Sequence, residues 1–199
     1  GDVTAVEGTT RLLVNQTLQV IEAAKAGGGD VALVGHSMAT DVLIRVAVED
    51  NTGPLVLLSA FSQAVTTEQP KDMLLISGQW EPHLREFGVD AVQMVNADAQ
   101  EGETIQKGDV IRSAIFAPWT EHVSILQSRA GRQAALDWLN RAYGRDTLAS
   151  APPTGWAFLA LMASITVLAS LLARLVVPEA PLPPSHQPGI LRYLGTLLV

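Results

Sequence analysis

A serine flanked by small residues stands in the stretch Gly-His-Ser-Met-Ala at positions 35–39. An apolar run precedes this stretch, and a segment predicted to be a helix follows it. A serine on such a strand-to-helix turn projects its hydroxyl, and the residues two before and two after it must be small because the chain reverses there. Gly35 and Ala39 meet this requirement, so we predict that Ser37 is a nucleophile. The backbone N–H of Met38, at the start of the helix, is the predicted oxyanion donor.

A serine hydroxyl is a weak nucleophile and needs an adjacent base, most often a histidine. The chain contains 4 histidines. His36 lies within the turn, and we expect its ring to point away from the serine. His83 begins a helix soon after a strand end, His122 lies in the loop before the last long helix, and His186 lies in a Pro-rich segment. Spacing alone leaves the choice of base open.

The elements around these residues alternate between helix and strand. Helices are predicted over Thr9–Lys25, Asp41–Val48 and Val123–Tyr143, and another begins at Glu81-Pro82. Strands are predicted over Val31–Val34, Leu55–Leu58, Met73–Ile76 and Val110–Phe116. This alternation is typical of a parallel α/β sheet flanked by helices.

The serine turn between strand and helix, followed by a carboxylate and then a histidine, resembles the C-terminal half of the α/β-hydrolase superfamily. The resemblance covers about residues 5–145. It implies that His122 is the base, because the family places the base in that loop. It also implies an acid in the loop after the preceding strand, where Glu81 is the carboxylate. Asp98 and Glu121 are the alternatives for the acid.

The resemblance implies a serine hydrolase of the carboxylester hydrolase or lipase type, which works through an acyl-enzyme at Ser37. It implies no metal or organic cofactor and a small-molecule ester or lipid-like substrate. The family takes a second oxyanion donor from a His-Gly-rich loop after an early strand. No such motif precedes Ser37, so we expect a domain that is incomplete at its N-terminus. Ala39 stands where the family usually has Gly, and Glu81 stands where it more often has Asp. The alternative is therefore a non-catalytic α/β-hydrolase-like binding or assembly domain.

A second apolar region follows this domain. The segment Trp156–Val177 carries a single charge, Arg174, and as a helix it would span roughly 33 Å, close to the ~30 Å of a bilayer core. Trp156 and Arg174 suit the two interfaces of a membrane. We therefore predict a transmembrane helix and a membrane location, while the charges around the segment leave its orientation open.

The predicted organisation is a partial α/β-hydrolase-like domain over 1–147, a linker over 148–155, a transmembrane helix over 156–177, a Pro-rich loop over 178–189 and the start of a possible second transmembrane helix over 190–199. The net charge is −7 and no Lys/Arg cluster is present, which argues against nucleic acid as a partner. With 0 cysteines, the chain has no disulfide, thiolate metal site or cysteine nucleophile.

Overall fold

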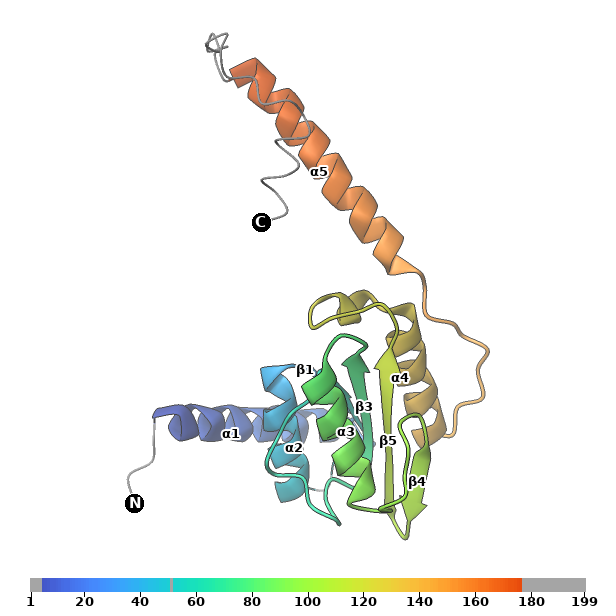
Figure 1. Cartoon of the computed structure of the whole chain (residues 1–199). Coiled ribbons are helices and arrows are strands. Elements are labelled where there is room, and N and C mark those ends of the chain that lie inside the picture. Colours follow the sequence, from blue (N-terminus) through green and yellow to red (C-terminus); the bar gives the residue numbers. More distant parts are fainter. Residues whose placement is uncertain (1–4, 51, 177–199) are drawn as a thin grey trace. The chain divides into compact units, whose positions relative to one another are not determined.

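The computed structural model describes residues 5–50 and 52–176 (Figure 1). The chain divides into two units, Gly1–Gly155 and Trp156–Val199. The Pro-rich loop and second apolar helix predicted after residue 177, as well as His186, lie outside the described residues. The elements are α1 (Ala5–Lys25), β1 (Leu33–His36), α2 (Met38–Glu49), β2 (Leu55–Leu58), β3 (Asp72–Gly78), α3 (Pro82–Gln93), β4 (Thr104–Lys107), β5 (Val110–Ala117), the 3₁₀ turn η1 (Ser124–Gln127), α4 (Arg129–Ala142) and α5 (Thr154–Val176).

The first unit is built on a five-stranded sheet in the order β1-β2-β3-β5-β4. β1, β2, β3 and β5 are parallel, as the alternation of elements predicts, and β4 is antiparallel to β5. Helices cover both faces of the sheet (Figure 1). The fold is therefore α/β, with a mostly parallel sheet and one antiparallel edge strand.

The alternation of side chains along β2 creates two apolar cores. Leu55 and Leu57 pack on one face with apolar residues of α1, α2 and α3. Val56 and Leu58 pack on the other face with Ile125 and with Trp138 of α4. All four residues of β2 are buried, which explains why this strand is a continuous apolar run rather than an alternating one.

Two expectations about the elements need correction, and one strand was not expected. The first strand runs over Leu33–His36 rather than Val31–Val34, and Val34 is 57% exposed because β1 has a neighbour on one side only within the described sheet. The helix expected over Val123–Tyr143 is interrupted at Ser128, whose Oγ accepts a hydrogen bond from Gly131 N and so begins α4. The edge strand β4 was not predicted.

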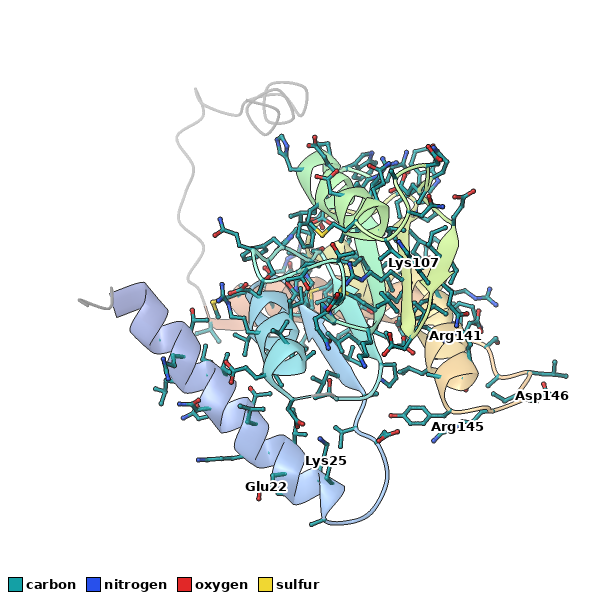
Figure 2. The ribbon with its side chains drawn as sticks, turned by 90° about the horizontal axis from the view of Figure 1, so that it is seen from below. Glu22, Lys25, Lys107, Arg141, Arg145 and Asp146 are labelled. Carbon is teal, nitrogen blue, oxygen red and sulfur yellow. The ribbon has the colours of Figure 1, made fainter. Side chains whose placement is uncertain are left out.

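Two ion pairs lie at the amino end of the parallel strands, and Figure 2 shows their basic members, Lys25 and Arg141, from below. Lys25 at the end of α1 forms an ion pair with Asp50, with 2.8 Å between Nζ and Oδ2. Arg141 of α4 forms another with Asp72, the first residue of β3, again at 2.8 Å. The first pair connects α1 with the end of α2, and the second connects α4 with the start of β3. Both lie at the amino end of the parallel strands, away from Ser37.

The apolar helix α5 is 23 residues long, and the mean hydropathy of its most apolar window is 2.1. It is thus long and apolar enough to cross a membrane, by length and composition. The predicted linker before it is partly packed: Ala151 is 6% exposed, and its N–H donates to Gln133 Oε1 of α4 at 2.8 Å.

Candidate active site

The three residues predicted for chemistry each follow a parallel strand of the sheet. Ser37 comes directly after β1, Glu81 follows the end of β3, and His122 follows the end of β5. Because these strands are parallel, their carboxyl ends lie side by side, and loops from strands distant in sequence meet there.

Ser37 occupies a strained turn between β1 and α2. Its φ is 56° and its ψ −127°, a region that L-residues rarely adopt. Its N–H donates to Leu58 O at 3.0 Å, and its carbonyl accepts from Thr40 Oγ1 at 2.6 Å. A Cβ on Gly35 would lie 2.6 Å from Leu43 Cδ1. These hydrogen bonds hold the turn in place. The absence of a side chain at Gly35 lets Leu43 of α2 pack closely against it.

The hydroxyl, an imidazole and a carboxylate form a continuous series of hydrogen bonds. His122 Nε2 lies 2.8 Å from Ser37 Oγ, and His122 Nδ1 lies 2.7 Å from Glu81 Oε1. An ionised carboxylate only accepts, so Nδ1 carries the proton in this pair. In the neutral ring Nε2 is then the acceptor for the serine hydroxyl. This is the tautomer that a base acting on Ser37 requires.

The carboxylate of Glu81 is buried and held by two further donors. Its Oε2 accepts from Ser59 Oγ at 2.8 Å and from Gly78 N at 2.6 Å. Glu81 is 8% exposed. A Cβ on Gly78 would lie 2.9 Å from Glu81 Oε2 and 2.7 Å from Thr120 O, so glycine is required where the side chain bends back. The side chain of Glu81 thus folds back toward Gly78 at the end of β3.

The other candidate groups lie elsewhere. The side chain of His83 is 94% exposed and faces Glu86, 3.9 Å away. Asp98 is exposed. Glu121 accepts hydrogen bonds from Val123 N and Ser124 N, and these bonds hold its pKa below the usual value. It stabilises its own turn rather than the imidazole.

The ring of His36 does not point away, contrary to our expectation. Its Nε2 lies 2.7 Å from the backbone oxygen of His122. Ser59, Gly78 and the contact of His36 are the features of the site that the sequence did not reveal. One signal was available for Ser59, a serine placed directly after a fully apolar strand at the edge where the other polar residues were expected.

The backbone at the start of α2 adjoins Ser37. Met38 is the first residue of this helix, so no carbonyl of the same helix accepts its N–H. The N–H groups of a first helical turn favour negative charge in front of them. Across residues 5–50 and 52–176, no group of three or more His, Asp or Glu side chains is arranged to hold a metal ion.

The arrangement can therefore activate a hydroxyl by removing its proton, and it offers a backbone donor beside that hydroxyl. Comparisons of the chain with protein-family models, curated proteins and solved structures find no match.

Proposed function

We propose that the protein is a membrane-anchored serine hydrolase that cleaves carboxylic esters. The hydrogen-bonded series from Ser37 Oγ through both ring nitrogens of His122 to Glu81, with distances of 2.8 and 2.7 Å, carries this proposal. The three residues come from separate loops, and their order along the chain is that of the α/β-hydrolase superfamily, which the sequence resembles.

In the proposed reaction Ser37 Oγ attacks the carbonyl carbon of the ester while His122 Nε2 accepts its proton. The N–H of Met38 donates to the oxygen that becomes negative, and Glu81 stabilises the imidazolium. The C–O bond to the alcohol then breaks, and the imidazolium returns its proton to the departing alkoxide. Water attacks the acyl-enzyme with His122 again as the base, which releases the carboxylic acid and restores the serine.

The side chains beside the three residues support an uncharged substrate with an apolar acyl group, including a lipid-like ester. Met38 and Val123, which adjoin Ser37 and His122, are 65% and 66% exposed. Trp80 and Trp119, in the loops of Glu81 and His122, are 58% and 76% exposed, and their rings meet edge-on with centroids 6.4 Å apart. The charged neighbour of His122 is an acid, which would repel an anionic substrate.

A fluorophosphonate probe on the full chain in detergent tests the proposal, because the probe reacts covalently with an activated serine. We expect labelling of the wild type, none of Ser37→Ala, and a sharp decrease in His122→Ala. His83→Ala is the matched control, since this histidine is exposed and lies outside the site. A folded wild type that the probe does not label would contradict the proposal and favour the non-catalytic binding domain.

The length and apolar composition of α5 support the membrane anchor. We expect the full chain to stay in the membrane fraction after alkaline carbonate extraction. The double substitution Ile165→Lys and Leu168→Lys places two charges in the middle of the helix and should release the protein, since each costs about 2.5–3.5 kcal/mol at the centre of a span. Release of the wild type by carbonate would contradict the anchor.

A further inference from the structure

His36 occupies the variable position of the serine turn, and its side chain contacts the backbone of the proposed base. Its Nε2 lies 2.7 Å from His122 O. The two imidazole rings are tilted by 46°, with centroids 4.9 Å apart. A carbonyl oxygen only accepts hydrogen bonds, so Nε2 of His36 carries a proton and donates it to this bond.

This bond joins two parts of the site that the sheet keeps apart. β1 ends at His36, β5 ends before the loop of His122, and β2 and β3 lie between the two strands. Two hydrogen bonds connect residues 35–40 with residues 118–123 in the described chain, and both reach His122. The bond from Ser37 Oγ must break as the proton moves, whereas the bond from His36 involves no reacting atom.

We infer that His36 is a positioning residue that holds His122 at hydrogen-bonding distance from Ser37, an inference that rests on the proposed function. Other hydrogen bonds join the loop to the end of β3: Trp80 N donates to Thr120 O at 3.1 Å, Trp119 N donates to Gln79 Oε1 at 2.9 Å, and Glu81 binds His122 Nδ1. Without His36, the reactive bond from Ser37 Oγ is the one direct hydrogen bond left between residues 35–40 and residues 118–123 of the described chain. A displacement of about 1 Å between reacting groups can lower a rate about 100-fold.

Two substitutions separate the hydrogen bond from the volume of the ring. His36→Phe keeps a ring and removes the donor, whereas His36→Gln places an amide N–H near the position of Nε2. On the full chain in detergent, we would measure the rate constant of inactivation by the fluorophosphonate, and kcat and KM for p-nitrophenyl butyrate. His36→Phe should lower the inactivation rate and kcat about 10- to 100-fold with little change in KM, and His36→Gln should restore both to within about threefold.

His83→Phe is the control for replacing a histidine by phenylalanine, and it should leave both rates unchanged. The inference is overturned if His36→Phe reacts as fast as the wild type, or if His36→Gln is as slow as His36→Phe. If His36→Phe does not fold, ¹⁵N NMR of the wild type decides, because an Nδ1–H tautomer of His36 would also overturn the inference. A wild type that the probe does not label contradicts the proposed function instead, and the tautomer still reports on the bond from His36.

Discussion

Two buried charged side chains lie at opposite ends of the same sheet and have different kinds of partners. Glu81 lies at the carboxyl end of the parallel strands and accepts hydrogen bonds from the side chains of Ser59 and His122 and from one backbone N–H. Arg112, near the amino end of β5, is fully buried. Its guanidinium donates to backbone carbonyls only, those of Thr66, Pro70 and Ala91.

The partners indicate what each charge does. The carbonyls around Arg112 do not titrate, and they belong to the loop before β3 and to α3, so the guanidinium fixes parts of the fold to one another. Burial lowers the pKa of Arg112 to about 10, which leaves it charged at neutral pH. One partner of Glu81 is the imidazole of His122, whose side chain is 44% exposed and whose charge changes during the proposed reaction. A buried charge with titratable, accessible partners favours chemistry, and one with backbone partners favours stability.

Removing the charge of Glu81 should have the largest effect and should act on the rate. Glu81→Gln keeps the length of the side chain but no longer stabilises the imidazolium or selects its tautomer. We expect kcat for p-nitrophenyl butyrate to decrease about 10³- to 10⁴-fold, the size seen when the acid of such a triad becomes an amide. Glu86→Gln, an exposed change in α3, is the control. A decrease in kcat smaller than about tenfold would contradict the assignment of the acid.

Removing the charge of Arg112 should instead act on stability. Arg112→Met fills much of the volume but leaves buried carbonyl oxygens without donors, at a cost of about 1–3 kcal/mol each. We expect the free energy of unfolding to decrease by about 3 kcal/mol and the melting temperature by about 6–12 °C. At a temperature where the variant is folded, kcat should match the wild type. A loss of kcat without a loss of stability would reverse the contrast with Glu81.

Ser59 tests whether the donors to Glu81 matter as well as its charge. Ser59→Ala removes the 2.8 Å hydrogen bond to Glu81 Oε2, and a bond to a charged group contributes about 1.5 kcal/mol or more. We expect kcat to decrease roughly tenfold, because the carboxylate is then less firmly held against His122. Ser113→Ala is a matched control, since Ser113 is also buried but donates to Glu103 O. Equal kcat values for the two variants would assign Ser59 to packing alone.

The fold was predictable where a segment is apolar enough to need burial on both faces. The limits of Leu55–Leu58 were predicted as they stand, because this strand lies between two neighbours. The limits of the first strand were wrong by two residues, because its pairing with β2 determines its ends and the apolar run does not. β4 is polar and largely exposed. It forms through pairing with β5 across Gly108, whose φ is 62°, and no periodicity in its own residues indicates this.

The site divides in the same way. The choice of Ser37 followed from a local motif, and the choices of His122 and Glu81 followed from the family resemblance. The proximity of these residues in space depends on the tertiary structure. The same holds for the contact of His36, whose partner lies 86 residues later in the chain. The bond from Ser59 to Glu81 joins residues 22 apart on neighbouring loops. No spacing rule covers such pairs, because they depend on which strands are adjacent in the sheet.

Glu121 extends the comparison to an exposed carboxylate one residue from His122, where we expect the smallest effect. Its hydrogen bonds from Val123 N and Ser124 N keep its pKa below the usual 4.5. These bonds are therefore complete above pH 4.5 and are lost as the pH falls through the lowered pKa. The amide resonances of Val123 and Ser124 should titrate with a midpoint below 4.5 and stay constant in Glu121→Gln.

Since this carboxylate is exposed and does not contact the imidazole, kcat of Glu121→Gln at neutral pH should stay within about twofold of the wild type. A decrease as large as that expected for Glu81→Gln would show that the acid had been assigned to the wrong residue.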